Sequence, residues 1–319
     1  MAFKDVVGHR RPIQILQKEI KGGRVHHAYL FTGMEGIGKR LVALNMAKAL
    51  NCINQEGEAC DHCNSCVRMD KGLHPDLIMI APEGETIKIQ QVRDLQREVA
   101  FKPYEARCRV IIVDGAERMT REAANAFLKT LEEPPPWTTI ILLATNVEAL
   151  PPTISSRCQR IRFNPLHQEE VRQILAHHLS ENDAYVLASL AGGSPGRILR
   201  IDREEVIRIK KELKTLLSAS VGQKMKLAQE LAQEEGRGKI FLEILQSWFR
   251  DLIVYLEMGE EGPLLNSDLT DEVKKSASYL KTEKLLQDFW AVVRIQRGVE
   301  AHGNLQLSLE SALLGLGGS

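Results

Sequence analysis

Several features are scarce in this sequence of 319 residues, and each scarcity excludes a class of protein. Lys and Arg together number 42, as do Asp and Glu, so the formal net charge is zero. A protein that binds nucleic acid through its overall charge needs a large positive excess, which this chain does not have. Aromatic residues make up only 5% of the chain, so few side chains are available for stacking on single-stranded bases. Any contact with DNA would therefore be local or shared with partner proteins.

Long hydrophobic runs are missing as well. The longest strongly apolar run, at about residues 140–144, is far shorter than the roughly 20 residues that a helix needs to span a bilayer. Residues 1–11 carry scattered charges and lack the apolar core of a secretory signal. We therefore expect a cytoplasmic protein that does not associate with membranes. With 44% hydrophobic and 26% charged residues, the composition is that of a globular chain and excludes intrinsic disorder.

The first half of the chain alternates short apolar runs with helical patterns, which is typical of a parallel sheet with connecting helices. We predict strands at 27–32, 109–114 and 139–145, and the run of apolar residues in the second fits a strand buried on both faces. Helices are predicted at 39–50 and 121–131, the latter because three consecutive prolines follow it and prevent its continuation. The fold class is therefore α/β.

After about residue 165 the strand signals disappear. Apolar residues recur at helical spacing in the segments 168–179, 183–190, 204–219, 224–232, 239–258, 270–278, 282–302 and 305–314. A glycine-rich break at 192–196 interrupts this half. We predict three domains: an α/β domain at 1–164, a small helical domain at 165–205 and an all-helical domain at 206–319.

A glycine-rich loop separates the first predicted strand from its helix. Its spacing, G-x-x-x-x-G-K, and its place after a strand match a phosphate-binding loop, in which backbone N–H groups face a polyphosphate. The residues that would bind phosphate are Gly33, Gly36, Gly38 and Lys39. Arg40 follows, where the pattern has a Ser or Thr whose hydroxyl binds Mg²⁺, and an arginine cannot bind a cation. A glycine-rich turn without a ligand is the alternative interpretation.

Asp114 ends the predicted strand 109–114, so it lies at the carboxyl edge of the sheet, where α/β proteins bind their ligands. An aspartate at this place in P-loop ATPases binds the metal ion, and a glutamate usually follows it to activate water. Gly115 follows here, and Glu117 lies three residues beyond the aspartate. A metal-binding role and a capping role for Asp114 both stay open at this point.

Four of the six cysteines lie close together in the chain. They are Cys52, Cys60, Cys63 and Cys66, in the pattern C-x7-C-x2-C-x2-C. Zn²⁺ takes four thiolates tetrahedrally, and a C-x2-C pair brings two sulfurs to one ion with little strain. We predict a closed structural zinc site; the alternatives are free thiols, or replacement of one cysteine by His62 or His74. Cys108 and Cys158 lie well outside the cluster and are interpreted as simple core or edge thiols.

Together these motifs resemble the clamp-loader subunits of the AAA+ family. The resemblance also rests on Val7-Gly8-His9, 124–135, Thr145-Asn146, Ser156-Arg157-Cys158 and 192–197. It covers about residues 1–200, and beyond them the chain is similar only as an all-helical domain with a Leu-rich end at 304–309. The fold that it implies is an AAA+ P-loop domain with a zinc insert at 52–66, a small helical lid and a helical collar domain that joins subunits.

The resemblance implies a set of residues for this chain's own nucleotide. These are Val7 and Gly8 at the adenine, Gly33–Lys39 as the Walker A loop, Asp114 as the Walker B acid, Thr145 or Asn146 at sensor 1 and Arg197 at sensor 2. The family members that hydrolyse ATP keep Ser or Thr after the Walker A lysine and Glu after the Walker B aspartate. Arg40 and Gly115 depart from both, so we expect no ATP hydrolysis by this chain, while binding of ATP or ADP stays open.

The sequence Ser156-Arg157-Cys158 resembles a clamp-loader motif whose arginine reaches into the ATP site of the adjacent subunit. Arg157 would thus act in trans, as an arginine finger. The implied function is that of a non-hydrolysing subunit of the bacterial DNA polymerase III holoenzyme, in a heteropentamer with gamma/tau and delta subunits. That complex would load the sliding clamp on primer–template DNA during replication.

The sequence offers two alternative functions. An active gamma/tau-like clamp-loader ATPase would use Lys39, Asp114 and an unconventional base such as Glu117. A zinc module that reads DNA is disfavoured by the zero net charge and the few aromatic residues.

Overall fold

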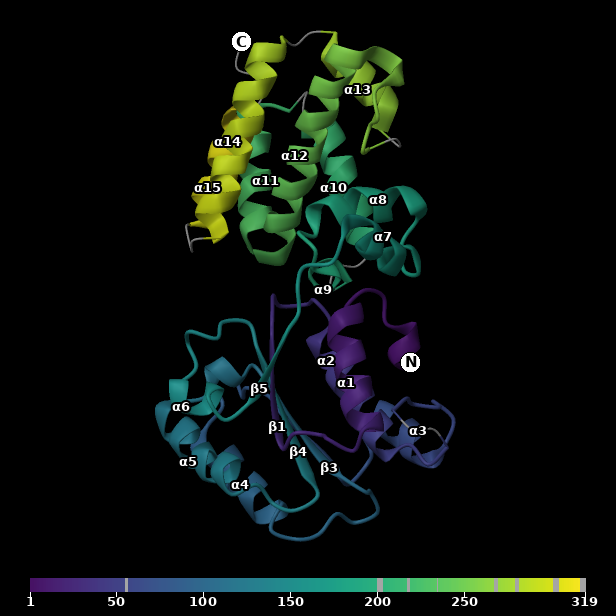
Figure 1. Ribbon diagram of the computed structural model, residues 1–319. Coiled ribbons are helices and arrows are strands. Elements are labelled where there is room, and N and C mark those ends of the chain that lie inside the picture. Colours follow the sequence, from purple (N-terminus) through teal and green to yellow (C-terminus); the bar gives the residue numbers. More distant parts are fainter. Residues whose placement is uncertain are drawn as a thin grey trace. The chain divides into compact units, whose positions relative to one another are not determined.

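The computed structural model describes residues 1–54, 57–199, 203–216, 219–233, 235–266, 269–278, 281–300 and 304–315. The chain forms two compact units, Met1–Glu170 and Val171–Ser319 (Figure 1). Within the described residues, no helix is long and apolar enough to cross a membrane.

The first unit is built on a five-stranded sheet in the order β2-β3-β4-β1-β5, in which every pairing is parallel. The strands are β1 (Ala28–Thr32), β2 (Leu77–Ile80), β3 (Arg109–Asp114), β4 (Thr138–Ala144) and β5 (Gln159–Arg162). All residues of β1 and β4 are buried, as the continuous apolar runs of the sequence require of strands covered on both faces. The predicted α/β class with a parallel sheet is confirmed.

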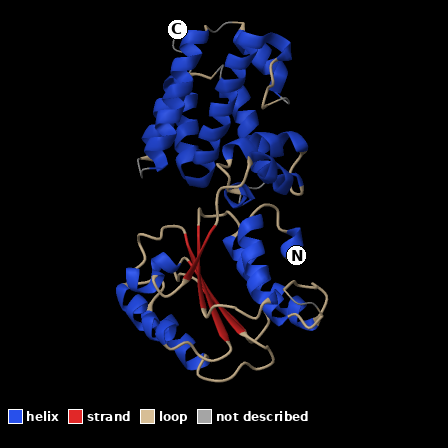
Figure 2. Cartoon of the chain, viewed as in Figure 1, coloured by secondary structure: helices blue, strands red, loops and turns tan. Residues whose placement is uncertain are grey.

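Helices cover both faces of this sheet (Figure 2). They are α1 (Arg10–Lys21), α2 (Lys39–Asn51), α3 (Asn64–Asp70), α4 (Ile89–Glu98), α5 (Arg121–Glu132) and α6 (Pro152–Ser155), with short 3-10 turns η1 (Phe3–Asp5) and η2 (Ala116–Arg118). Alternate strand residues such as Leu30 and Ile111 join Phe127 of α5 in one core, on the side of α4, α5 and α6. The residues between them, such as Phe31, point to the opposite face, where α1 and α2 lie.

The second unit is entirely helical in its described residues. Its helices are α7 (Gln168–Ala176), α8 (Glu181–Leu190), α9 (Pro195–Leu199), α10 (Arg203–Leu216), α11 (Val221–Gln233), α12 (Glu235–Met258), α13 (Thr270–Ala277), α14 (Thr282–Glu300) and α15 (Leu305–Gly315), with η3 (Gly259–Glu261) after α12. The apolar stripe of α12, including Phe241, Leu245 and Trp248, is buried and forms the core of the unit. The expected helices 204–219 and 282–302 include 217–218 and 301–302, which lie outside the described residues. The division at 205 stays a prediction.

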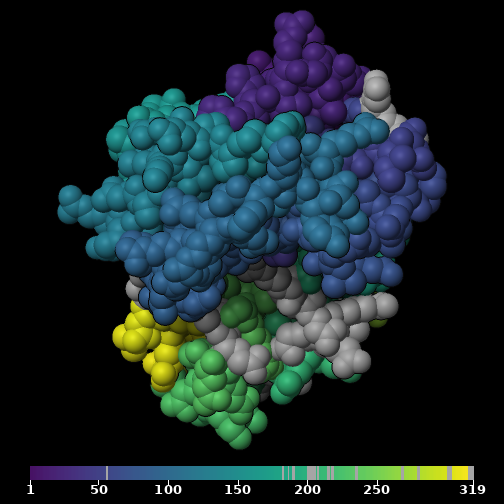
Figure 3. Space-filling model, turned by 90° about the horizontal axis from the view of Figure 1, so that it is seen from below, coloured from purple at the N-terminus to yellow at the C-terminus, as the bar shows by residue number. Residues whose placement is uncertain are grey.

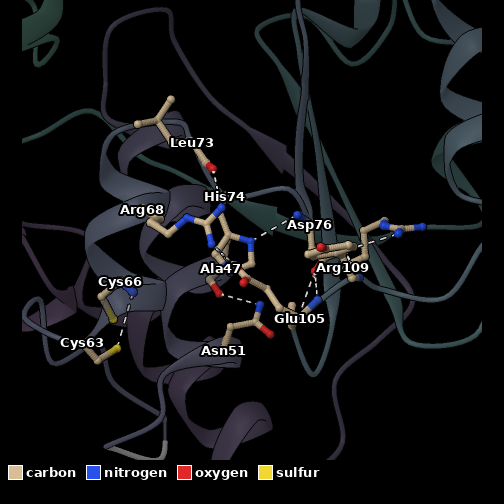
Figure 4. A network of polar contacts seen from close by, with 12 residues as sticks. Ala47, Asn51, Cys63, Cys66, Arg68, Leu73, His74, Asp76, Glu105 and Arg109 are labelled. Carbon is tan, nitrogen blue, oxygen red and sulfur yellow. Dashed lines mark hydrogen bonds and ion pairs between the residues drawn. The ribbon is translucent and has the colours of Figure 1, made fainter.

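A buried carboxylate fixes the loop between α4 and β3 (Figure 4). Asp76 is fully buried, and its oxygens accept hydrogen bonds from three consecutive amides, those of Tyr104, Glu105 and Ala106, at 2.7, 2.9 and 2.9 Å. The Arg109 guanidinium lies 3.3 Å from the same carboxylate. Burial alone would raise the pKa of Asp76, but the three amides and the guanidinium together hold it below its usual range.

We expect Asp76→Ala to destabilise the first unit by about 3–5 kcal/mol, because it leaves a buried guanidinium and three amides without their acceptor. The pKa of Asp76 is lowered by folding, so its contribution is present above the unfolded-state pKa of about 4 and is lost as the pH falls. Urea denaturation at pH 7 and at lower pH measures both effects, which the exposed-site variant Asp94→Ala should not show. Equal midpoints for the two variants at pH 7 would refute this assignment.

Candidate nucleotide and zinc sites

The glycine-rich loop leads directly from β1 into α2, and its shape depends on two of its glycines. A Cβ atom on Gly33 would lie 2.6 Å from the carbonyl oxygen of Phe163, so no larger residue fits there without a shift of the backbone. Gly38, which precedes the first residue of α2, has a φ of 107°, a conformation that side chains disfavour. The sequence therefore builds the tight strand-to-helix turn that a phosphate-binding loop requires.

Lys39 is turned inward onto its own loop. Its Nζ donates hydrogen bonds to the carbonyl oxygens of Gly33 at 2.6 Å and Met34 at 2.7 Å. Only 7% of the residue is exposed. Burial lowers the pKa of Lys39, against the opposing effect of Glu117 and Asp114. A bound polyphosphate would therefore replace these two carbonyl oxygens as the hydrogen-bond partner of the Lys39 ammonium group.

Arg40 lies against the carboxylate that would bind a metal ion. Its Nη1 is 3.8 Å from Oδ2 of Asp114, and its Nη2 is 3.9 Å from the sulfur of Met79 on β2. The position after the lysine thus supplies a fixed positive charge in place of a hydroxyl ligand. Since Asp114 already faces a guanidinium, the residues present do not fit the usual Mg²⁺ site.

Glu117 reaches the same edge of the sheet. Its Oε1 accepts hydrogen bonds from the amide of Thr145, at 3.0 Å, and from the Thr145 hydroxyl, directly after β4. Its other oxygen, Oε2, is buried and has no hydrogen-bond partner. The structure therefore brings together the lysine of the loop, the acid that ends β3, Glu117 and the predicted sensor residue Thr145.

The segment before α1 packs on the back of the loop. The Nε2 atom of His9 lies 2.8 Å from the carbonyl oxygen of Ile37, and the His9 ring packs edge-on against Phe163 with centroids 4.9 Å apart. Burial lowers the pKa of His9, which favours a neutral ring. This contact places Val7 and Gly8 next to the loop; their role at an adenine stays a prediction. This contact of His9 was not predicted from the sequence.

Arg157 and Arg197, the two arginines with predicted roles at ATP sites, each have an acidic partner. Arg157, which follows α6, has its Nη2 2.6 Å from Oε1 of Glu132 and its Nη1 2.9 Å from the carbonyl oxygen of Thr153. Its side chain is 36% exposed, so the guanidinium reaches the surface. Arg197 lies in the second unit, on α9, with its Nη2 3.6 Å from Glu243 of α12.

The four clustered cysteines form a group that could hold a metal ion. Their sulfur atoms all lie within 4.8 Å of one another, close to the spacing of about 3.8 Å that four Zn–S bonds of 2.3 Å impose. Burial raises the pKa of the Cys60 thiol, but hydrogen bonds from the backbone of His62 and Cys63 outweigh it and lower the pKa to about 6, which favours a thiolate. The donor set fits zinc.

Neither histidine belongs to this group. His62 has its Nδ1 2.6 Å from the carbonyl oxygen of Cys60 and its Nε2 3.2 Å from the side-chain nitrogen Nδ2 of Asn54. His74 is buried, and its Nδ1 accepts a hydrogen bond from the amide of Asp76 at 3.1 Å. A metal ion held by four cysteines would have no open position, as a structural site requires.

The other two cysteines lie apart from the cluster in partly buried positions. The sulfur of Cys108 lies 3.3 Å from the hydroxyl oxygen of Thr139. Burial raises the pKa of the Cys158 thiol to about 11, so it stays protonated and unreactive at neutral pH.

A groove at the amino ends of the strands, the edge opposite to the loop, was not predicted from the sequence. It has a volume of about 550 Å³ and is lined by Phe101, Lys102, Lys129, Pro135 and Trp137, among others. The Lys102 ammonium lies 5.2 Å from the centroid of the Trp137 ring, and Trp137 has a φ of 58°. In Figure 3, the view from below shows the blue to teal surface to which these segments belong. A tryptophan directly after three prolines was the signal in the sequence.

Comparisons with known proteins agree over both units. Residues 8–167 match the family described as "DNA polymerase III, delta subunit", and residues 205–317 match "DNA polymerase III, delta subunit, C terminal". The chain is 29% identical over 312 residues to DNA polymerase III subunit delta' of Bacillus subtilis, which covers 95% of this chain and 94% of that protein.

Relatives named as tau and gamma subunits match as well, but over part of their length. DNA polymerase III subunit tau/gamma of Haemophilus influenzae is 38% identical over 182 residues, or 57% of this chain and 26% of that protein. DNA polymerase III subunit tau of Bacillus subtilis is 29% identical over 315 residues, or 89% of this chain and 56% of that protein. The chain thus spans nearly all of the delta' relative, about a quarter of the Haemophilus influenzae protein and just over half of the Bacillus subtilis tau protein.

We expect the purified chain to hold one zinc ion, and removal of that ion to lower its thermal stability, because the cluster ties the end of α2 to α3. Metal analysis and thermal denaturation before and after chelation measure both. Cys63→Ser should lose zinc, whereas the matched control Cys158→Ser should keep it. Loss of zinc in both variants, or its absence from the wild-type chain, would contradict the assignment.

Proposed function

The chain belongs to the DNA polymerase III delta-subunit family, which has the AAA+ clamp-loader fold, and from that premise we propose that it serves as the delta-prime subunit of a clamp loader. In this role it would work in the cytoplasm, within a complex of gamma/tau and delta subunits. That complex would place the sliding clamp on primer–template DNA.

One observation carries the choice of a non-hydrolysing subunit. The nucleotide loop is intact, but Arg40 lies 3.8 Å from Asp114, where a hydrolysing subunit needs a metal ion. Gly115 also leaves no glutamate directly after Asp114 to activate water. A loop that retains its lysine and lacks the means of hydrolysis suits a subunit that can bind ATP or ADP without turning it over. The similarity to a delta' protein over nearly its whole length supports the same choice.

Arg157 is the residue by which such a subunit would act on its neighbour. Its guanidinium is partly exposed, and Glu132 and the Thr153 carbonyl oxygen hold it in a defined orientation. A phosphate of an adjacent ATP could replace the Glu132 carboxylate as its partner, since a guanidinium binds both groups through the same paired donors. We propose that Arg157 stabilises the negative charge that develops on the neighbour's ATP.

The remaining assignments follow the family's arrangement. We propose that residues 165–205 form a lid in which Arg197 is the sensor 2 arginine, and that 206–319 form the collar that holds subunits together. In the first unit, Val7 and Gly8 would border the adenine, Gly33, Gly36, Gly38 and Lys39 would hold phosphate, and Cys52, Cys60, Cys63 and Cys66 would bind a structural zinc. The packing of α12 against α14 and of α11 against α15 gives the collar a continuous core.

A gamma/tau-like ATPase is the second candidate, and one observation favours it. Glu117 lies at the carboxyl edge of the sheet with one carboxylate oxygen, Oε2, buried and without a partner. Such an oxygen could accept a proton from an attacking water. The similarity to the tau/gamma protein of Haemophilus influenzae is confined to 57% of this chain.

We expect Arg157→Ala to lower the clamp- and DNA-stimulated ATPase of the reconstituted complex, because an arginine finger contributes about 10³–10⁵ in rate at the site that it completes. The ATPase rate that remains should be that of the ATP sites in the complex to which this chain contributes no arginine. Arg157→Lys should lose most of this effect as well, since a lysine keeps the charge and loses the paired donors.

Arg162→Ala is the matched control, because Arg162 is exposed on the neighbouring strand β5. It should leave the ATPase unchanged, and gel filtration should show that all three variants assemble. An Arg157→Ala complex that assembles and hydrolyses ATP at the wild-type rate would exclude the arginine-finger role.

The isolated chain should hydrolyse no ATP, because Arg40 replaces the hydroxyl ligand and Gly115 the usual glutamate. Steady-state phosphate release with and without primed DNA measures this, and Lys39→Ala, purified in parallel, gives the background from contaminating enzymes. Turnover by the wild-type chain that disappears in Lys39→Ala would favour the second candidate.

A further inference from the structure

We propose that the phosphate-binding loop takes its nucleotide without a divalent cation, and that Arg40 supplies the positive charge that Mg²⁺ supplies in the usual site. The inference rests on the nucleotide binding included in the proposed function and defines the chemical form of the nucleotide: free ATP or ADP, not the magnesium complex. The nucleotide would stay bound to the chain without being hydrolysed.

The first step is that the site rejects Mg²⁺. Arg40 offers no ligand atom, and a guanidinium keeps its proton at any pH that a protein experiences. It lies 3.8 Å from Asp114, the carboxylate on which a cation would have to depend. A divalent cation at Asp114 would therefore meet a fixed like charge and lack a hydroxyl ligand.

The second step is that Arg40 has donors left for a phosphate. One terminal nitrogen faces Asp114 and the other faces the sulfur of Met79, which is a weak acceptor. The Arg40 side chain is 64% exposed, so most of its N–H groups are open to solvent and can exchange water for phosphate oxygens. Arg40 can thus stay near Asp114 and still bind an anion.

The third step concerns the other charges that face the loop. Asp114 is opposed by Arg40, one oxygen of Glu117 accepts hydrogen bonds from Thr145, and Glu35 in the loop acts with these two acids to favour the charged form of Lys39. Lys39 stands at the start of α2, where the first amides of a thirteen-residue helix also point. Two side-chain cations and the helix end therefore meet a free polyphosphate, without a bound metal between them.

The experiment compares the affinity of the full-length chain for ATP and for ADP, by titration calorimetry, in metal-free buffer and with excess MgCl₂. The metal-free buffer is prepared with a chelating resin and not with EDTA, because a soluble chelator would also withdraw zinc from the cysteine cluster. We expect Mg²⁺ to weaken wild-type binding or to leave it within about threefold.

Three variants separate the effects of the Arg40 charge, the missing hydroxyl and the loop lysine on nucleotide binding. Arg40→Ser restores the hydroxyl of the motif and should make Mg²⁺ strengthen binding by about tenfold or more. Arg40→Gln removes the charge without adding a hydroxyl, and should weaken binding in both buffers. Lys39→Ala should abolish binding, which locates it at the loop. With Mn²⁺ as a probe, electron paramagnetic resonance should detect nucleotide-dependent metal binding by Arg40→Ser but not by the wild-type chain.

Two results would overturn the proposal. One is wild-type binding that Mg²⁺ strengthens tenfold or more, with Mn²⁺ bound beside the nucleotide. The other is a wild-type chain that binds neither ATP nor ADP in either buffer. The role of Arg157 needs no nucleotide in this chain, so either result would leave that role intact, and the ATPase of the Arg157→Ala complex tests it separately.

Discussion

The parallel pairing of β1, β4 and β3 is the constraint on which the rest of the first unit depends. Thr32 is in register with Ala144, and Leu143 with Asp114, so the three strands end at one level. At that edge, β1 is followed by the glycine-rich loop, β3 by the turn that carries Glu117, and β4 by Thr145. Residues more than 100 positions apart in the sequence therefore meet in one site because of backbone hydrogen bonds, before any side chain is considered.

Helix α2 connects this edge to the cluster of four cysteines. It begins with Lys39 in the loop and ends at Asn51, next to Cys52, so its thirteen residues extend about 20 Å between the two. Lys48, near the end of the helix, is fully buried and pairs with Asp61 and Asp70 on the segment that carries the cysteines. A metal ion in the cluster would thus hold the far end of the helix whose near end forms the phosphate loop. A zinc ion bound there would thus have a structural role.

Much of the fold could be predicted from the sequence, because buried strands and capped helices leave strong patterns. The strand predicted at 109–114 matches β3. Helix α5 begins after Thr120, whose hydroxyl oxygen accepts a hydrogen bond from the backbone amide of Ala123. The edge strands β2 and β5 were missed because they are four residues long and only partly buried. The contact of Arg40 with Asp114 could not be predicted either, since it joins residues 74 positions apart whose side-chain directions no local pattern reveals.

We propose separate roles for two arginines: Arg40 would exclude a metal ion from this chain's own nucleotide site, and Arg157 would act on a neighbour's ATP. The role of Arg157 is tested most directly by a structure of the assembled complex with a non-hydrolysable ATP analogue. We expect the Arg157 guanidinium to have left Glu132 and to contact a phosphate oxygen of the nucleotide in the adjacent subunit. An Arg157 still paired with Glu132, beside an occupied neighbouring site whose phosphates are bound by other residues, would contradict it.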